Sequence, residues 1–292
     1  MTTVGSGKYT YDLIEDWPKL PAGESLGIVS SVATDSQDRV YAFQRQDPPV
    51  MVFDRDGKYL HCWGIGAITD PHGINIVDDV VYVTDRSDQV AVKFTLDGKP
   101  LQVIGDRGVF SDTGCEKPGD LVPRAAGPFN YCTEMSTSPS GDIYISDGYR
   151  NARVHRFTSD GQLIQSWGQP GKEEPGHFHL VHSLLVDPVG KIYVCDRANQ
   201  RVQIFSPEGE FITMWTGMGG PDNIVRDEDG IFYIAEQADE SGDSHVSIWD
   251  GDGNVLERWP IRHAHGLEVD SHGDIYLGLT LEHSVDKYVR KR

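Results

Sequence analysis

The stretch from residue 139 to residue 168, PSGDIYISDGYRNARVHRFTSDGQLIQSWG, carries the pattern that decides the fold. A turn of small and polar residues leads into a short apolar strand centred on Tyr144. A second strand, an Asp-Gly turn and a third strand ending at Trp167 follow. Short alternating strands separated by turns that contain glycine are typical of antiparallel hairpins. The stretch therefore predicts consecutive strands of one antiparallel sheet.

The same unit occurs six times along the chain. Its tyrosine recurs roughly every 40 to 60 residues, close to the period of a four-stranded propeller blade. The six tyrosines are Tyr41, Tyr82, Tyr144, Tyr193, Tyr233 and Tyr276. We therefore predict an all-β fold, a six-bladed β-propeller, in which residues 1–292 form a single domain.

The two ends of the chain predict how the propeller closes. The last repeat ends at HSVDKYVRKR (283–292), one strand short, whereas the chain begins with a spare strand, KYTYDLIEDWP (8–18). We expect the N-terminal strand to join the last blade, because this closure avoids an exposed sheet edge. The wide gap after Tyr82 contains an irregular segment, 105–130, which we interpret as a lid over one face. A surface loop is the alternative.

The composition excludes some classes of partner. The 292 residues contain 26 Lys and Arg against 45 Asp and Glu, a net charge of −19, which argues against nucleic acid. No apolar run approaches the roughly 20 residues of a bilayer span. The N-terminus lacks the basic start and apolar stretch of a signal peptide. We expect a cytoplasmic protein that binds a small molecule, without a nucleic-acid or membrane partner.

Histidines occupy one repeat position in alternate repeats. Aligned on the tyrosines, the start of each first strand carries Ser30, His72, Thr133, His182, Asp222 and His265. In a propeller this strand lines the central channel, so the three histidines would converge on one point. Three imidazoles with an open side are typical of a catalytic zinc site. The alternative, that each histidine only caps a strand through a carbonyl, does not explain the alternation.

Arginines occupy a second repeat position, four residues after the tyrosines. It carries Arg45, Arg86 and Arg197, and in the third repeat Tyr149 lies one residue beyond it. If this turn emerges on the face that the histidines occupy, the arginines would surround the metal and match a substrate carboxylate. The alternative for Arg86 and Arg197, each preceded by aspartate, is a salt bridge that holds the turn.

Three stretches, SDGYRNARVHRF (146–157), HFHLVHSLLVD (177–187) and CDRANQRVQIF (195–205), resemble the NHL-repeat propellers. Within these, the chain is similar to the peptidyl-alpha-hydroxyglycine alpha-amidating lyases, the lyase domains of peptidylglycine alpha-amidating enzymes. The resemblance covers nearly the whole chain and is most specific over 142–205. It implies a zinc ion on His72, His182 and His265. It also implies a catalytic role for Tyr149, Arg45 and Arg197.

Two positions depart from that family. The resemblance implies a structural calcium, held by an aspartate after the third histidine and by carbonyls that correspond to Val32 and Ile74. Here Gly266 replaces the aspartate, so the calcium would lack its carboxylate. Secreted members carry a cysteine after the catalytic tyrosine, where this chain has Arg150. Both changes suit a cytosolic relative whose substrate need not be a peptide.

The implied reaction cleaves the C–N bond of an N-acyl hemiaminal, which yields an amide and glyoxylate or a related carbonyl compound. Zinc would bind the hydroxyl, and Tyr149 would move its proton with Arg45 as the nearby cation. Arg197, together with Arg86, would orient a carboxylate or carbonyl. Two alternatives remain open. One is a metal-dependent hydrolase, such as a lactonase or an amide or ester hydrolase, and the other is a non-catalytic NHL scaffold.

Overall fold

The computed structural model describes residues 2–239 and 241–291, and these residues form a six-bladed β-propeller, as the sequence predicts. The described helical segments are two three-residue 3-10 turns, η1 (Gly7–Tyr9) and η2 (Arg197–Asn199). Neither is long or apolar enough to cross a membrane. The chain forms two compact units, a terminal unit (1–71 and 222–292) and a middle unit (72–221). That residues 1–292 form a single domain stays a prediction.

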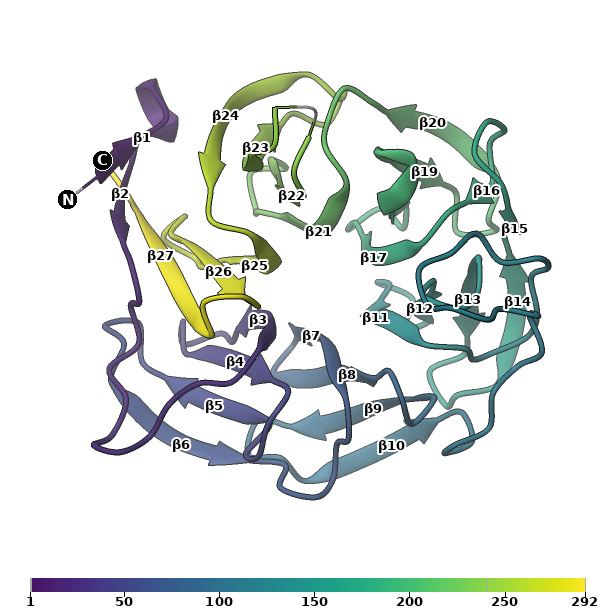
Figure 1. Cartoon of the computed structure of the whole chain (residues 1–292), viewed down its shortest axis with the longest axis horizontal. Helices are drawn as coiled ribbons and strands as arrows, with labels where there is room; N and C mark the ends of the chain where they lie inside the picture. Colours follow the sequence, from purple (N-terminus) through teal and green to yellow (C-terminus); the bar gives the residue numbers. More distant parts are fainter. Residues whose placement is uncertain (1, 240, 292) are drawn as a thin grey trace. The chain divides into compact units, whose positions relative to one another are not determined.

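The middle unit contains three four-stranded antiparallel blades (Figure 1). Their strands are β7 (Pro71–Val77), β8 (Val80–Asp85), β9 (Val90–Thr95), β10 (Pro100–Ile104), β11 (Cys132–Thr137), β12 (Ile143–Asp147), β13 (Arg153–Phe157), β14 (Leu163–Trp167), β17 (Val181–Val186), β18 (Ile192–Asp196), β19 (Arg201–Phe205) and β20 (Phe211–Trp215). A short parallel pair, β15 (Gln169–Pro170) and β16 (His177–Phe178), follows the second of these blades. In each blade the strands are ordered as they occur in the chain, so consecutive hairpins build the sheet.

The terminal unit contains the other three blades. Their strands are β3 (Val29–Thr34), β4 (Val40–Gln44), β5 (Val50–Phe53), β6 (Tyr59–Trp63), β21 (Pro221–Arg226), β22 (Phe232–Glu236), β23 (Ser244–Trp249), β24 (Val255–Ile261), β25 (Ala264–Val269), β26 (Ile275–Leu279) and β27 (Ser284–Arg290), with β1 (Thr2–Val4) and β2 (Tyr11–Ile14) from the N-terminus.

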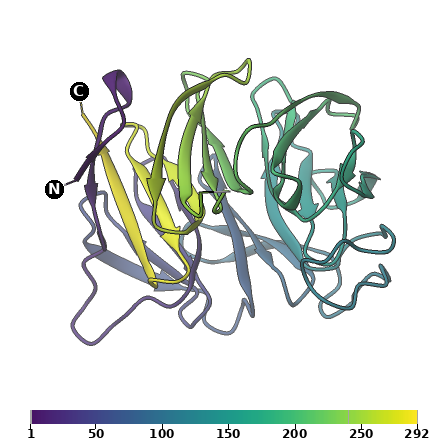
Figure 2. The same cartoon turned by 45° about the horizontal axis from the view of Figure 1, so that its top comes forward.

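The N-terminal strand completes the last blade, as predicted. β2 pairs antiparallel with β27, with Tyr11 opposite Arg290 and Leu13 opposite Tyr288. Figure 2 shows the purple N-terminal strand along the edge of the yellow β27. The Tyr11 ring lies 5.4 Å from that of Trp259, and Tyr11 is fully buried. The closure therefore covers an open edge and also adds an aromatic side chain to the core.

In four of the six repeats a turn aspartate accepts a hydrogen bond from the repeated tyrosine. Asp35 Oδ1 accepts hydrogen bonds from the backbone N–H groups of Gln37 and Arg39, and Asp35 Oδ2 accepts one from the Tyr41 hydroxyl at 3.0 Å. The same bond joins Asp227 to Tyr233 and Asp270 to Tyr276. One carboxylate thus folds the turn and also gives the buried phenol its partner.

The segment 105–130 belongs to the middle unit, and it forms no strand. Phe129 is 1% exposed, and burial of such a ring stabilises a fold by about 2 kcal/mol. Val122 and Cys115 join a core cluster with Val154 and Phe205. The segment is therefore anchored at several points. Its role as a lid stays a prediction.

Candidate metal and substrate site

The histidine position coincides with a β-bulge. The pairing of β17 with β18 shifts register between Val181 and Ser183, which leaves His182 as the extra residue. The same shift occurs around His265 in β25, and around Ser30 and Thr133 at the equivalent positions of β3 and β11. A bulge redirects the side chain of its extra residue. The aligned sequence position is therefore structurally special, although alternation of apolar residues alone does not reveal the bulge.

Two of the histidines are held in the tautomer that a metal ligand needs. His72, in the middle unit, is buried, and its Nδ1 donates to the Thr133 carbonyl at 2.7 Å. His265, in the terminal unit, donates from Nδ1 to the Ser30 carbonyl at 2.6 Å. Because a carbonyl oxygen only accepts, Nδ1 carries the proton and Nε2 keeps its lone pair. These bonds also fix the ring orientation, as is usual for metal-binding histidines.

His72 and His182 lie side by side in the middle unit. Their ring centroids are 4.9 Å apart, and their ligand nitrogens lie within 4.8 Å of one another. Both residues are 2% exposed, and imidazole nitrogens in such a buried pair suit Zn²⁺ better than Ca²⁺ or Mg²⁺. Two of the three predicted ligands are thus brought together within one unit, and their donor atoms fit a zinc ion.

Tyr149 lies against these two histidines. Its hydroxyl is 3.0 Å from His182 Nε2, and its ring centroid is 5.2 Å from that of His72. The 105–130 segment holds the backbone here, because Gly119 N–H donates to the Tyr149 carbonyl at 2.7 Å and Thr113 Oγ1 donates to the Arg150 carbonyl at 2.6 Å. The candidate catalytic tyrosine is therefore positioned by a segment distant from it in the sequence.

Two of the three predicted arginines flank Tyr149. The guanidinium carbons of Arg86 and Arg197 lie 4.9 Å and 5.3 Å from the Tyr149 ring centroid. Arg197 Nη1 is 3.5 Å from the Tyr149 hydroxyl, at the limit of a hydrogen bond. Arg86 also lies 5.5 Å from the ring of Tyr131, a residue that the sequence pattern does not single out. Two positive charges thus adjoin the histidine pair within one unit.

Arg45 lies in the terminal unit. Its Nε donates to the Pro71 carbonyl at 3.1 Å and is 3.5 Å from Asp70 Oδ1. The cations in contact with Tyr149 in the middle unit are Arg86 and Arg197, so Arg45 as the cation beside Tyr149 stays a prediction.

The structure has no room for an aspartate where the calcium would need one. A Cβ atom on Gly266 would lie 2.4 Å from the Cα of Ser31 and 3.1 Å from its Oγ. Because backbone atoms fill this space, a side chain could enter only if β3 moved. The residue at position 266 therefore does not fit the structural calcium that the resemblance implies.

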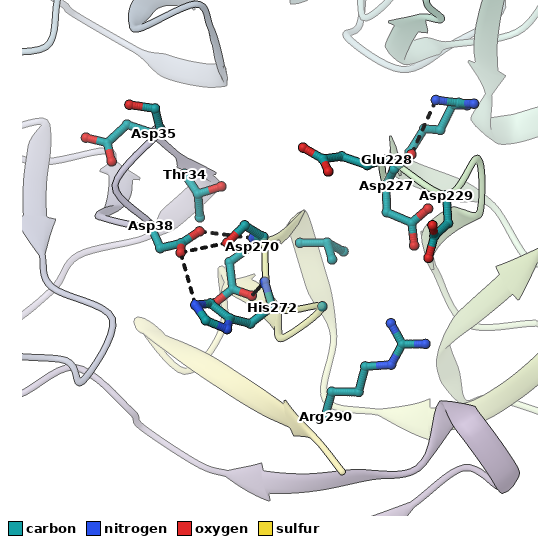
Figure 3. Close-up of a pocket in the computed structure, with 14 residues that line it drawn as sticks. Thr34, Asp35, Asp38, Asp227, Glu228, Asp229, Asp270, His272 and Arg290 are labelled. Atoms are coloured by element: carbon teal, nitrogen blue, oxygen red, sulfur yellow. Dashed lines mark hydrogen bonds and ion pairs between the residues drawn. The ribbon is translucent and has the colours of Figure 1, made fainter. Parts of the chain in front are cut away.

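A cavity of about 470 Å³ lies in the terminal unit among the repeat turns (Figure 3). None of the predicted site residues lines it. Asp227 and Asp270 accept hydrogen bonds from tyrosines, and Asp38 accepts from Ser271 and lies 3.4 Å from the His272 ring nitrogen. These three carboxylates therefore have partners within the fold, and the cavity contains none of the residues predicted to bind metal or substrate.

The six blades, and the buried histidine pair beside a tyrosine and two arginines, define a β-propeller with a candidate metal site. The chain belongs to the NHL-repeat family. It is 30% identical over 307 residues to human NHL repeat-containing protein 3, an alignment that covers 97% of this chain and 85% of the human protein. No family model matches the chain.

Two further comparisons bear on the class of activity and on the fold. Peptidyl-alpha-hydroxyglycine alpha-amidating lyase 2 of Drosophila melanogaster is 26% identical over 257 residues, 78% of this chain and 59% of the fly protein. A streptogramin B lyase structure matches with a TM-score of 0.60 at 11% identity, covering 96% of this chain and 98% of that one. The structural match shows the fold alone, whereas the sequence match makes the chain similar to a named lyase.

Proposed function

We propose that this protein is a zinc-dependent carbon–nitrogen lyase that cleaves an N-acyl hemiaminal, an alpha-hydroxyglycine-like substrate, to an amide and glyoxylate or a related carbonyl compound. The observation that carries the proposal is the 3.0 Å contact between the Tyr149 hydroxyl and His182 Nε2, beside His72 and two arginines. Similarity to a named amidating lyase supports the same class of reaction.

His72, His182 and His265 would hold the metal ion. The support for His265 is its matching repeat position and its Nδ1 bond to a carbonyl, which parallels that of His72. A bound zinc ion would supply Lewis acidity toward the substrate hydroxyl. If Nε2 of His182 held the metal ion, it would no longer be available to the Tyr149 hydroxyl, which would then be free to bind the substrate.

Tyr149 would move one proton within the substrate. In the proposed reaction the carbinol O–H loses a proton, the C=O bond forms, the C–N bond breaks and the departing nitrogen gains a proton. A Tyr149 phenolate that takes the proton of the carbinol hydroxyl, and as the resulting phenol gives it to the departing nitrogen, would balance this sequence without any other acid or base. The position of Tyr149 next to both histidines suits this transfer, because a general base must lie within hydrogen-bond reach of its proton.

The arginines would bind the substrate carboxylate. A guanidinium matches a carboxylate with two parallel hydrogen bonds, and the guanidinium groups of Arg86 and Arg197 both lie over the ring of the reacting tyrosine. Such binding fixes the carbinol carbon relative to Tyr149. We propose Arg45 as a third contact, on its repeat position alone.

A non-catalytic scaffold is the second candidate, because human NHL repeat-containing protein 3 is more similar in sequence than the fly lyase and its name states no activity. A scaffold would need neither the tautomer fixed by Thr133 nor a tyrosine ring in contact with two cations. These two features favour the enzyme.

Metal content and product identity test the proposal. Atomic absorption should find stoichiometric zinc, and N-acetyl-alpha-hydroxyglycine should give acetamide and glyoxylate. Acetate in place of acetamide would indicate a hydrolase, and the absence of zinc and turnover would indicate a scaffold. His182→Ala should lose zinc and activity together, whereas Tyr149→Phe should keep zinc and lose activity. Full turnover by metal-free His182→Ala would overturn the mechanism.

A further inference from the structure

A cavity of about 370 Å³ lies between the 105–130 segment and Arg150, the residue that follows Tyr149. Phe110 and Ser111 line it from the segment, together with Asn130 and, from the turn, Arg150. None of these four residues belongs to the histidine or arginine repeat positions. The cavity is therefore formed by the part of the chain that interrupts the propeller repeat.

Three buried polar atoms of the cavity residues have no partner among the described residues. Asn130 is 4% exposed, and its Nδ2 donates to the Ser111 carbonyl at 2.8 Å and to Thr113 Oγ1 at 3.2 Å. These bonds fix the amide so that its Oδ1 is the unpartnered acceptor. The hydroxyl of Ser111 and Nε of Arg150 are likewise unpartnered. Because buried polar groups are normally hydrogen-bonded, the cavity is suited to a polar ligand.

The cavity adjoins the Tyr149 site through two chain neighbours. Arg150 follows Tyr149 directly, and Tyr131 follows Asn130. The guanidinium of Arg86 lies over the rings of both Tyr149 and Tyr131, at 4.9 Å and 5.5 Å. The guanidinium carbon of Arg150 also lies 5.5 Å from the centroid of the Tyr131 ring. A substrate held at Tyr149 could therefore extend past Arg86 and Tyr131 to the cavity.

The unpartnered atoms define the chemistry of the ligand. Arg150 Nε and the Ser111 hydroxyl can donate to an oxygen, whereas Asn130 Oδ1 requires an N–H or O–H donor. An alkyl group would satisfy none of these atoms, and a carboxylate would offer no donor to Asn130 Oδ1. A primary carboxamide or ureido group offers a carbonyl oxygen and an N–H on one planar unit. The exposed Phe110 ring, 6.2 Å from Tyr131, supplies an apolar wall for the chain that carries it.

We propose that this cavity is a second substrate subsite, which binds the acyl end of the substrate and selects acyl groups that end in a carboxamide or ureido group. The assignment of the ligand as substrate rests on the proposed lyase function. The binding chemistry itself does not, since it follows from Asn130, Ser111 and Arg150.

Matched substrates test the selectivity. We would compare alpha-hydroxyglycines whose N-acyl chains of two to four methylenes end in a carboxamide with those that end in the branched alkyl group of the same shape. The zinc-loaded wild type should show a kcat/KM for the best carboxamide substrate about tenfold above its alkyl counterpart, because a site built for hydrogen bonds rejects a partner that leaves them unmade. Ser111→Ala should reduce this preference about fivefold, through loss of one hydrogen bond.

Val109→Ala is the matched control, since Val109 is 58% exposed, precedes Phe110 and does not line the cavity, and its preference should equal that of wild type. A binding measurement separates the two proposals. If no substrate turns over, the lyase proposal fails. The subsite then stands if propionamide shifts the amide NMR signals of Asn130 and Arg150 in wild type, and if Ser111→Ala needs about fivefold more propionamide for the same shift. No preference among active substrates, or no propionamide shift in either protein, would overturn the subsite and leave water as the occupant of the cavity.

Discussion

A Cβ atom on Gly148 would lie 1.9 Å from the carbonyl oxygen of Val181. Gly148 precedes Tyr149 and Val181 precedes His182, so the contact of these two backbones sets the approach of the Tyr149 hydroxyl to His182 Nε2. The φ of Gly148 is outside the left-handed region, so glycine is required here for space and not for backbone conformation. The smallest side chain would push the turn away from β17.

Gly148→Ala should therefore separate Tyr149 from His182 while leaving the blades folded. We expect kcat/KM to fall about 100-fold, since a displacement of about 1 Å at a reacting group has that effect. The free energy of unfolding should fall by about 1–3 kcal/mol, as is usual when a side chain is forced into packed space. Steady-state kinetics and urea unfolding check both values. Gly127→Ala, where a Cβ would meet open space, is the control. Wild-type turnover by Gly148→Ala would show that this contact does not position Tyr149.

Arg197→Lys separates substrate binding from a role in holding the turn. Lysine keeps the positive charge but loses the planar fork that matches a carboxylate. We expect KM to rise about tenfold with a smaller change in kcat, because each hydrogen bond to a charged group contributes about 1.5–3 kcal/mol. Arg107→Lys, at an exposed ion pair with Asp88, should leave KM unchanged. An unchanged KM together with a lower melting temperature in Arg197→Lys would favour the salt-bridge interpretation of this position.

The fold can be predicted from the sequence because both partners of the repeated interaction recur. In four of the six repeats the tyrosine lies six residues after a turn aspartate that accepts a hydrogen bond from its hydroxyl, as in Asp35 and Tyr41 or Asp270 and Tyr276. The repeat phase also aligns His72 with His182, which the structure brings together. The local pattern predicts the blades, and the repeat position predicts the histidine pair. Neither prediction requires knowledge of a long-range contact.

Alignment of the repeats does not predict other features of the site. The bulge at His182 changes the strand register without changing the residue spacing. Tyr131 and Gly119 belong to the irregular segment, which has no counterpart in other repeats, and Gly119 meets the Tyr149 carbonyl only in the folded chain. The sequence shows a glycine at position 148, but it does not show that the Val181 backbone leaves no space for a side chain there.

Substitutions of His155 test whether a residue found in one blade is tolerated at the equivalent position of another blade. It is fully buried, with Nδ1 2.7 Å from the Ser166 hydroxyl and Nε2 3.3 Å from Asp147 Oδ2. In the next blade Gln203 donates to Asp196 Oδ2 at 3.0 Å in the same way. His155→Gln should therefore cost less than about 1 kcal/mol, whereas His155→Leu should cost about 1–3 kcal/mol because it leaves Asp147 and Ser166 without this partner. Equal losses in urea unfolding would contradict the equivalence of the blades.

Glu268, in β25, should make the stability of the fold depend on pH. Burial raises the pKa of its carboxyl from 4.5 to about 7, and hydrogen bonds from the backbone N–H groups of Val269 and Thr34 offset only part of this effect. The folded state therefore holds this proton more tightly than the unfolded chain does. The resulting stability is fully present below about pH 4.5 and is lost as the pH rises to about 7, with a total on the order of 3 kcal/mol.

Glu268→Gln keeps the shape of the protonated side chain and cannot ionise. It should leave the free energy of unfolding nearly unchanged at pH 4.5 and raise it at pH 8, by up to about 3 kcal/mol. Urea unfolding at the two pH values measures the difference. Glu282→Gln, at an exposed position before β27, is the control for removal of one negative charge from a chain of net charge −19. Because the control lacks the burial, its effect should be small at both pH values. A gain at pH 8 that Glu282→Gln matches would trace the effect to net charge, and a Glu268→Gln effect of equal size at both pH values would mean that the carboxyl does not titrate in this range.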